Sequence, residues 1–255
     1  MRRLPMRVLG LMLLSLSLLA GCGAPPTMVG TPPTNLQLDN RNAAGSSGQN
    51  FNQQAFLRQL LNEINATWIS NQTISCTLTG NYVSLQDGTA GSNKINYDFE
   101  KPNKTSMTIL QSSEGGMAGT KIVWTGGQQL AVHTQLMGFW LNTTLGIHDS
   151  RCTDQRGYYV DQTSISAMMD TLLDPQNQIR GLRLGTLNGV PVAQLDIVSP
   201  KSLQGISHEV FTIDGDKKVP IAREMYDQSN RLVDSIQMDN VVLNSTLPSN
   251  TFSVN

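Results

Sequence analysis

The sequence is poor in the residue types that mark most enzymes and nucleic-acid-binding proteins. Charged residues make up 15% of the 255 residues, and the 18 basic side chains are balanced by 19 acidic ones, which argues against nucleic acid as a partner. The three histidines, His133, His148 and His208, show no metal-ligand spacing. A nucleophile elbow and a phosphate-binding glycine loop are also missing. We therefore expect no enzyme, no cofactor and no metal, and rank a hydrolase last among the alternatives.

The sequence also has no apolar run long enough to span a bilayer. The longest, Val8–Leu19, suits the core of a signal peptide, and three arginines precede it within the first seven residues. It leads into Leu-Ala-Gly-Cys, ending at Cys22, which resembles the lipobox of bacterial lipoproteins. We predict that residues 1–21 are a signal peptide that is removed and that Cys22 carries the acyl chains. An ordinary signal peptide with a chance cysteine is the alternative.

The resemblance to a lipobox implies an exported protein that is anchored to the cell envelope through acylated Cys22. Two or three acyl chains hold a protein on a membrane essentially permanently, because each buried methylene contributes ~0.8 kcal/mol. Gly23 stands where an aspartate would indicate retention in the inner membrane. In a host with two membranes, this implies the periplasmic face of the outer membrane.

Two cysteines remain after Cys22, Cys76 and Cys152. An even pair in an oxidising compartment predicts a disulfide, and the alternative is two buried thiols too far apart to bond. Removal of the signal arginines leaves 15 basic and 19 acidic side chains, a net charge of −4. The mature protein is therefore mildly acidic.

Residues 22–50 contain few large apolar side chains and much Gly, Pro, Asn, Ser and Thr, which predicts a lipidated cysteine followed by a flexible tether. Residues 51–255 have the length of one domain with a sizeable core. Within it, a capping-box-like start at Asn50 and apolar residues at helical spacing from Phe56 to Ile64 predict an N-terminal helix. A second apolar stripe over Thr163–Leu173 predicts a mid-chain helix that Pro175 ends.

The rest of the domain shows short runs of period-two character separated by turn residues, which indicates antiparallel strands. Asn188-Gly189, Asp214-Gly215 and the segment 227–230 are predicted hairpin turns. The expected fold is mainly β with α: a strongly curved antiparallel sheet, or unclosed barrel, of about eleven strands covered by the two helices. The predicted strands are Ile74–Leu85, Lys94–Lys101, Ser106–Gln111, Lys121–Thr125, Gln129–Gln135, Arg156–Val160, Ile179–Leu187, Val190–Ile197, Glu209–Ile213, Ala222–Tyr226 and Leu232–Leu243.

Three local segments, Tyr97–Lys104, Val123–Leu130 and Asn244–Phe252, resemble segments of the LolA/LolB-like lipoprotein-carrier superfamily. The resemblance follows the order of elements over nearly the whole mature domain and implies an unclosed barrel with a helical lid. The soluble carrier of that family has an arginine lid latch where this chain has Lys101. Lysine lacks the planar guanidinium fork, so we expect Lys101 at most to replace part of that latch.

Together, the anchor and the resemblance predict a membrane-anchored module that binds a lipid or a lipoprotein acyl chain in a hydrophobic cavity. The alternative is a structural or sensory envelope lipoprotein with a filled core that acts through its outer surface. Acyl chains need an apolar lining and no directional groups. The candidate lining residues, each of which is otherwise an ordinary core residue, are Met107, Ile109, Trp124, Trp140, Met168, Met169 and Leu172.

Overall fold

A computed structural model describes residues 36–38, 53–84, 88–113, 115–154 and 156–254 of the chain. The predicted signal peptide, Cys22 and most of the predicted tether lie outside these residues. None of the helices among the described residues is long and apolar enough to cross a membrane.

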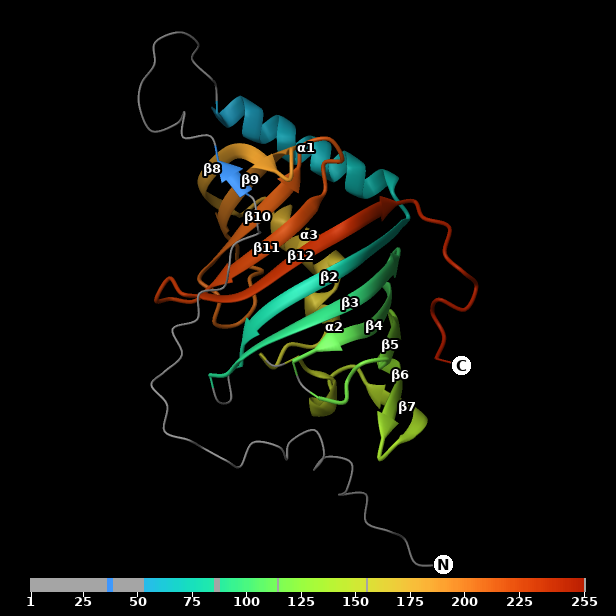
Figure 1. Ribbon diagram of the computed structural model, residues 1–255. Coiled ribbons are helices and arrows are strands. Elements are labelled where there is room, and N and C mark those ends of the chain that lie inside the picture. The colour runs from blue at the N-terminus through green and yellow to red at the C-terminus, as the bar shows by residue number, and fades with distance from the viewer. Residues whose placement is uncertain (1–35, 39–52, 85–87, 114, 155, 255) are drawn as a thin grey trace, which may run out of the picture.

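One antiparallel sheet dominates the molecule, and it is curved and not closed (Figure 1). Its strand order is β1-β8-β9-β10-β11-β12-β2-β3-β4-β5-β6-β7, so β1 and β7 form the two free edges. The strands are β1 (Leu36–Leu38), β2 (Thr73–Val83), β3 (Ala90–Glu100), β4 (Lys104–Ser112), β5 (Lys121–Thr125), β6 (Gln129–Leu136), β7 (Phe139–Gly146), β8 (Gln178–Leu187), β9 (Val190–Val198), β10 (His208–Asp214), β11 (Pro220–Tyr226) and β12 (Leu232–Leu243).

The N-terminal helix α1 (Gln53–Ser70) packs one stripe of its surface on the sheet. Leu60 and Ile64 are its fully buried residues, one helical turn apart, which is the spacing of a single apolar stripe. The Asn71 side-chain amide donates to the Thr67 carbonyl over a distance of 2.7 Å and so satisfies a carbonyl at the end of the helix. The predicted N-terminal helix is thereby confirmed.

The mid-chain helix α3 (Ile165–Leu172) follows the four-residue helix α2 (Val160–Thr163) and packs on the same core. The Ser164 hydroxyl accepts a hydrogen bond from the Ala167 amide and caps its first turn. In Figure 1, α2 and α3 lie behind the strands, while α1 crosses the upper part of the sheet. The two predicted helices therefore do cover the sheet.

Most predicted strands and turns are present. The β8–β9 turn has Asn188 at φ 52° and Gly189 at φ 82°, the left-handed conformations that Asn-Gly favours. Asn230, at φ 58°, lies in the turn between β11 and β12. The β10–β11 turn differs in detail, because its left-handed residue is Lys218, at φ 57°, and Gly215 is not.

The predicted strand at Arg156–Val160 is wrong. The segment turns on Asp154, whose carboxylate accepts hydrogen bonds from the amides of Arg156 and Tyr158, each at 2.9 Å. The one sheet-like contact there is an isolated bridge between Thr153 and Tyr159. A side chain that binds nearby backbone amides competes with strand pairing, so this segment becomes a loop.

Two strands were not predicted. β7 contains no buried residue, so its sequence lacks the alternation of buried and exposed positions that identifies a half-buried strand. β1 lies within the range predicted to be a tether and pairs with β8 through Leu36 opposite Leu187.

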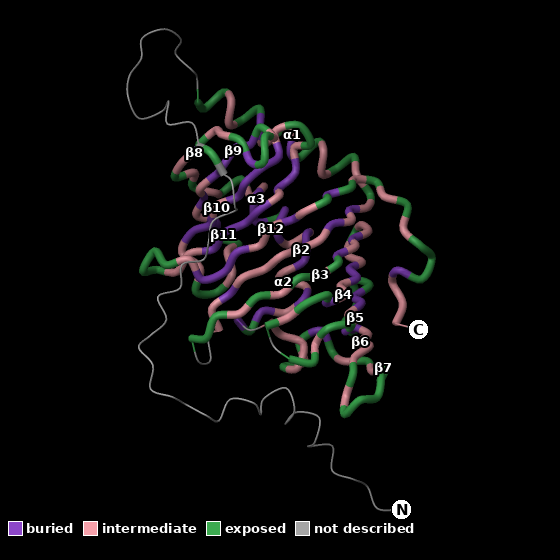
Figure 2. Tube along the Cα trace, in the orientation of Figure 1, coloured by how far each residue is buried: buried purple, intermediate pink, exposed green. Residues whose placement is uncertain are grey.

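Two hydrophobic clusters of buried residues lie among the purple segments of the central strands and helices in Figure 2. The larger cluster lies between the sheet and the helices α1 and α3. The smaller one lies near β5 and β6 and is built on Trp124, Leu130, Ile147 and Val160. Met107, on β4, packs against both clusters.

Candidate functional site

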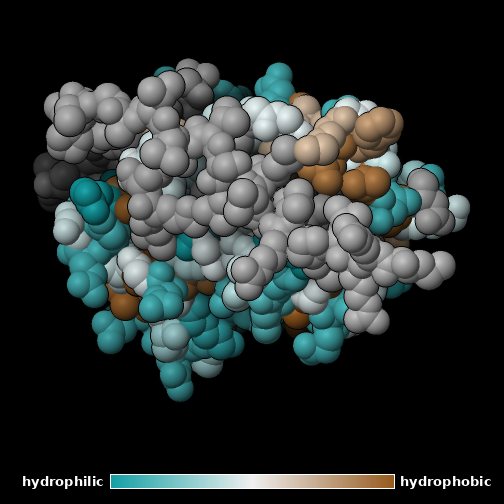
Figure 3. Space-filling view, turned by 90° about the horizontal axis from the view of Figure 1, so that it is seen from below, coloured by the Kyte–Doolittle hydropathy of each residue, from teal (hydrophilic) through white to brown (hydrophobic). Residues whose placement is uncertain are grey.

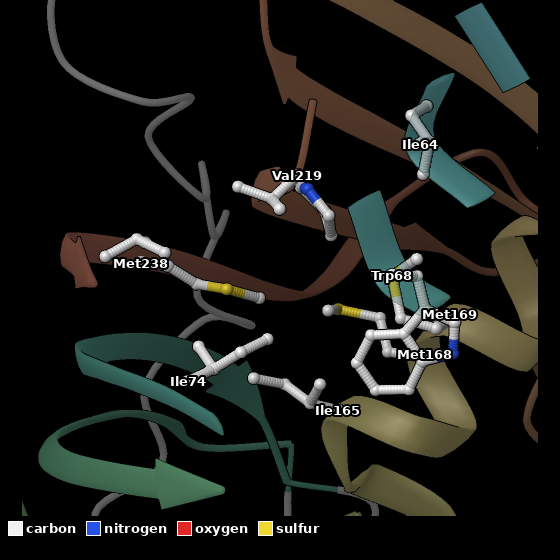
Figure 4. Close-up of a pocket in the computed structure, with 10 residues that line it drawn as sticks. Ile64, Trp68, Ile74, Ile165, Met168, Met169, Val219 and Met238 are labelled. Carbon is white, nitrogen blue, oxygen red and sulfur yellow. The ribbon is translucent and has the colours of Figure 1, made fainter. Parts of the chain in front are cut away.

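The candidate site is an apolar pocket between the two covering helices and the sheet (Figure 4). Helix α1 contributes two side chains and helix α3 contributes three, while the sheet side comes from β2, from β12 and from the start of β11. Every lining residue is apolar or aromatic: Ile64, Trp68, Ile74, Ile165, Met168, Met169, Val219, Pro220, Met238 and Val241.

The pocket is small. Its volume is about 20 Å³, which is room for roughly one water molecule. Pockets that hold small organic ligands measure roughly 300–1,000 Å³. In this conformation the space between helices and sheet is therefore filled by the protein's own side chains, among them the flexible methionines Met168, Met169 and Met238.

A wider depression of about 280 Å³ lies over β2 and β3, and most of the residues that line it are polar. Its lining includes Ser75 and Asp98, whose side chains form a hydrogen bond of 2.7 Å. Five of the seven residues that line this depression are polar or charged, whereas the pocket under the helices is lined by apolar and aromatic residues alone, so that pocket is the better candidate site for an acyl chain.

Lys101 fastens the C-terminal end of α1 to the sheet. It follows β3, and its ammonium group donates to the backbone carbonyls of Trp68 and, over 3.2 Å, of Ile69. The same group lies 4.4 Å from the centre of the Trp68 ring. A cation at the carbonyl end of a helix is favourable, and burial lowers the pKa of this lysine. Lys101 thus contacts the N-terminal helix directly, and the side chain that it holds, Trp68, lines the pocket.

A second lysine contacts the middle of the same helix. The Lys218 ammonium lies 3.0 Å from the Glu63 carboxylate. Hydrogen bonds from Gln59 and then from Lys218 lower the pKa of Glu63. Lys218 directly precedes Val219 and Pro220 of the pocket wall, so this ion pair joins α1 to the opposite side of the pocket.

The seven predicted lining residues do not gather in one place. Met168 and Met169 line the pocket, and Leu172 is buried in the same cluster behind them. Trp124 belongs to the smaller cluster, where its indole N–H donates to the Gly127 carbonyl, and Met107 lies between the clusters.

Ile109 is buried on β4 and does not line the pocket. The prediction that Trp140 lines a cavity is corrected, because nearly half of this residue is exposed at the β7 edge. The prediction also missed the sheet side of the pocket, including Ile74, Met238 and Val241. Apolar alternation marked these as core residues but could not show which of them face a helix.

The predicted disulfide is wrong, because Cys76 and Cys152 are both free thiols. Cys76 lies on β2 in the larger cluster, whereas Cys152 packs against the smaller one. Burial, with smaller contributions from Asp98 and Asp239, raises the pKa of Cys76 to about 12. Burial likewise raises the pKa of Cys152 to about 11. At neutral pH both thiols are protonated and poorly nucleophilic.

A buried ion pair lies on strands β10 and β11. The Arg223 guanidinium donates to the Glu209 carboxylate over 2.6 Å, and both side chains are almost completely shielded from solvent. Nearby, burial and then the charge of Asp154 raise the pKa of Asp234 to about 7. These groups occupy part of the core without belonging to the apolar pocket.

The loop that replaces the predicted strand covers this charged region. Its Arg156 is buried, and its guanidinium donates to the backbone carbonyls of Val83, over 2.9 Å, and of Val233, over 3.5 Å. Arg156 of this loop therefore links one end of β2 to one end of β12. The pattern of the sequence could not predict this contact.

The histidines are dispersed. His148 lies 2.9 Å from Asp161 at the surface, His133 stacks on Trp140, and His208 is buried and stacks on Tyr226. Burial lowers the pKa of His208. Among the residues that the structure describes, no group of three metal-ligating side chains is present.

Comparison with family models and with curated proteins finds no match. Solved structures of similar outline include an uncharacterized conserved protein from Thermus thermophilus, at 9% identity and a TM-score of 0.47, covering 77% of this chain and 92% of that one. They also include a LolA superfamily protein from Nitrosomonas europaea, at 11% identity and a TM-score of 0.38, covering 77% and 96%. The lipoprotein LppX from Mycobacterium tuberculosis follows at 14% identity and a TM-score of 0.43, covering 75% and 98%.

Proposed function

We propose that this chain, an open curved sheet under two helices, is a lipid-anchored envelope protein that holds an acyl chain between its helices and its sheet. The observation that supports the proposal is the composition of the pocket, whose ten lining residues are all apolar or aromatic. An acyl chain gains free energy simply by leaving water, so such a lining is sufficient for binding.

Binding requires the pocket to widen, because about 20 Å³ does not admit an alkyl chain. Helix α1 is the element best suited to move. It buries only Leu60 and Ile64 completely, and its polar attachments include Lys101 at its end and Lys218 near its middle. Methionine side chains on the α3 side adapt their rotamers to a new neighbour at little cost. In this mechanism α1 swings away from the sheet and the acyl chain takes its place against Met168 and Met169.

The anchor is the second part of the proposal. The lipobox-like sequence that ends at Cys22 supports it, and incorporation of a palmitate analogue at that residue tests it. In a host with two membranes, we propose that the protein stays on the periplasmic face of the outer membrane.

A second function is favoured by one observation, the small volume of the pocket. If the helices never separate from the sheet, the domain is a structural or sensory lipoprotein that acts through its outer surface.

Native extraction followed by mass spectrometry, together with uptake of a fluorescent fatty acid, separates the two functions. Acyl binding predicts co-purified lipid and saturable uptake. Met169→Trp, which fills the pocket from α3, should abolish uptake, while Met225→Leu, a buried methionine outside the pocket lining, should leave uptake unchanged. No lipid and no uptake in the unmodified protein would establish the filled core.

A further inference from the structure

The hairpin that joins β6 to β7 carries an exposed apolar tip, which we define as residues 136–141. The six residues are Leu-Met-Gly-Phe-Trp-Leu, with no charged or amide side chain among them. The exposed fractions are 69% for Met137, 73% for Phe139, 48% for Trp140 and 42% for Leu141. Figure 3 shows brown side chains gathered on the β7 side of the molecule, and Figure 1 shows this hairpin at the opposite end of the sheet from α1. A hydrophobic hairpin tip is unusual, because turns normally carry polar residues.

The backbone conformation of the tip is one that its apolar residues do not favour. Met137 has φ 52° and Gly138 has φ 83°, closely matching the Asn188-Gly189 turn between β8 and β9 at 52° and 82°. Asparagine suits this left-handed conformation, whereas a bulky residue without a local hydrogen-bonding group is disfavoured there. The β8–β9 hairpin therefore has the favoured asparagine, whereas the β6–β7 hairpin has a strained methionine that is about two-thirds exposed to solvent. Folding alone does not account for that choice.

The chain around the tip carries no formal charge. No Asp, Glu, Lys or Arg occurs from residue 122 to residue 148. Free sheet edges are normally protected by charged side chains, and β7 is a free edge. The absence of charge removes the largest cost of placing a segment in an apolar medium.

Trp140 is held in position at this edge. Its ring stacks on His133, with the ring centres 4.8 Å apart and the planes 2° from parallel. The indole ring also lies against Gly119, where a Cβ atom would come within 2.7 Å of it. A half-exposed tryptophan that is ordered beforehand contributes contact area at a small entropic cost.

We propose that the β6–β7 tip inserts into the interfacial layer of a lipid bilayer, as a second contact beside the acylated N-terminus. The proposal rests on the anchor in the proposed function. Thirteen residues lie between Cys22 and Leu36 of β1, so the fourteen Cα-to-Cα steps give a reach of at most roughly 50 Å. This exceeds the diameter of a compact domain of this size, roughly 43 Å, so the far edge of the sheet can reach the anchoring membrane.

A bilayer fits this surface better than a second copy of the chain does. Four side chains at one convex turn expose a few hundred Å², whereas a stable dimer buries about 800 Å² on each partner. Further along β7, Asn142, Thr143 and Thr144 are polar, so the apolar surface is confined to the tip. Aromatic and aliphatic residues gathered at one protrusion match the composition of bilayer interfaces.

The test uses the mature chain with Cys22→Ser, exported behind an ordinary cleavable signal so that it is not acylated. Vesicles of phosphatidylcholine and phosphatidylglycerol should bind it, and vesicles with brominated acyl chains should quench its tryptophan emission. Trp140→Phe should remove most of the quenching, because Trp124 is buried and Trp68, on α1, is half-buried in the pocket. Phe139→Thr should weaken vesicle binding about tenfold.

Met137→Asn is the second variant, because it relaxes the turn and so cannot weaken binding by unfolding the hairpin. It should raise the melting temperature and still weaken vesicle binding. Val242→Thr, at an apolar position 51% exposed on β12, should change neither. Equal binding by all variants, or no binding by the unmodified tip, overturns the proposal. A change in molar mass caused by the tip variants in the absence of lipid overturns it in favour of a second copy. Each result is independent of whether lipid co-purifies in the pocket.

Discussion

Replacing Lys101 with methionine should loosen α1 and leave the rest of the sheet intact. The substitution keeps the aliphatic stem and removes the ammonium group, which donates to two carbonyls at the helix end and lies 4.4 Å from the Trp68 ring centre. A cation at a helix end contributes about 0.3–1 kcal/mol, and a cation–π contact about 0.5–1 kcal/mol at a partly exposed site. Together they amount to about 1–2 kcal/mol, or a factor of roughly 5–30 in the population of the opened helix.

Hydrogen exchange measured by mass spectrometry on peptides from residues 53–70 reports this opening directly. Exchange in Lys101→Met should be roughly 5–30 times faster than in the unmodified protein, while peptides from β9 and β10 should be unchanged. Lys101→Arg keeps the charge and should exchange at nearly the original rate. Lys104→Met is the matched control, because the Lys104 ammonium pairs with the Glu100 carboxylate at a partly exposed site and lies over the ring of Phe252, which is not part of α1.

The same variant tests whether opening of α1 controls the uptake of a fatty acid. If α1 is the element that moves, Lys101→Met should also take up a fluorescent fatty acid faster. Unchanged exchange in residues 53–70 would refute the fastening role of Lys101. Faster exchange without any change in uptake would refute α1 as the entrance.

Three further predictions concern the buried groups. Arg223→Met should lower the free energy of unfolding by about 3–5 kcal/mol in urea titrations, because it leaves the Glu209 carboxylate buried without its partner, and adding Glu209→Leu should restore most of the loss. Because the pKa of Asp234 is raised from 3.8 to about 7 in the folded state, the stability due to this group should fall as the pH rises from about 4 to about 7, and Asp234→Asn should remove that slope. At pH 8, Cys76 should resist a thiol reagent until the protein is unfolded, and Cys152 should react slowly. A reducing agent should not shift the melting temperature. Such a shift would indicate that the two cysteines form a disulfide.

The sequence determined the elements whose signals are local. Asn188-Gly189 specifies a hairpin because its dihedral preferences need no tertiary partner, and the apolar stripe of α3 follows from helical periodicity alone. The same reasoning failed at Arg156–Val160, where a carboxylate that captures backbone amides replaced a strand, and at β7, where exposure on both faces removed the alternation.

What the tertiary structure decided is which side chains meet. Met168 and Met169 could be assigned to a helical face, yet only the folding of the chain brings Ile74 and Met238 opposite them, from strands far apart in sequence. It likewise placed Cys76 and Cys152 in different clusters, and it put Trp140 at a free sheet edge and not in the core. Local periodicity records whether a residue faces inward or outward. The partner that it meets there depends on sheet order and curvature, which are set by pairings between strands that no short segment of sequence specifies.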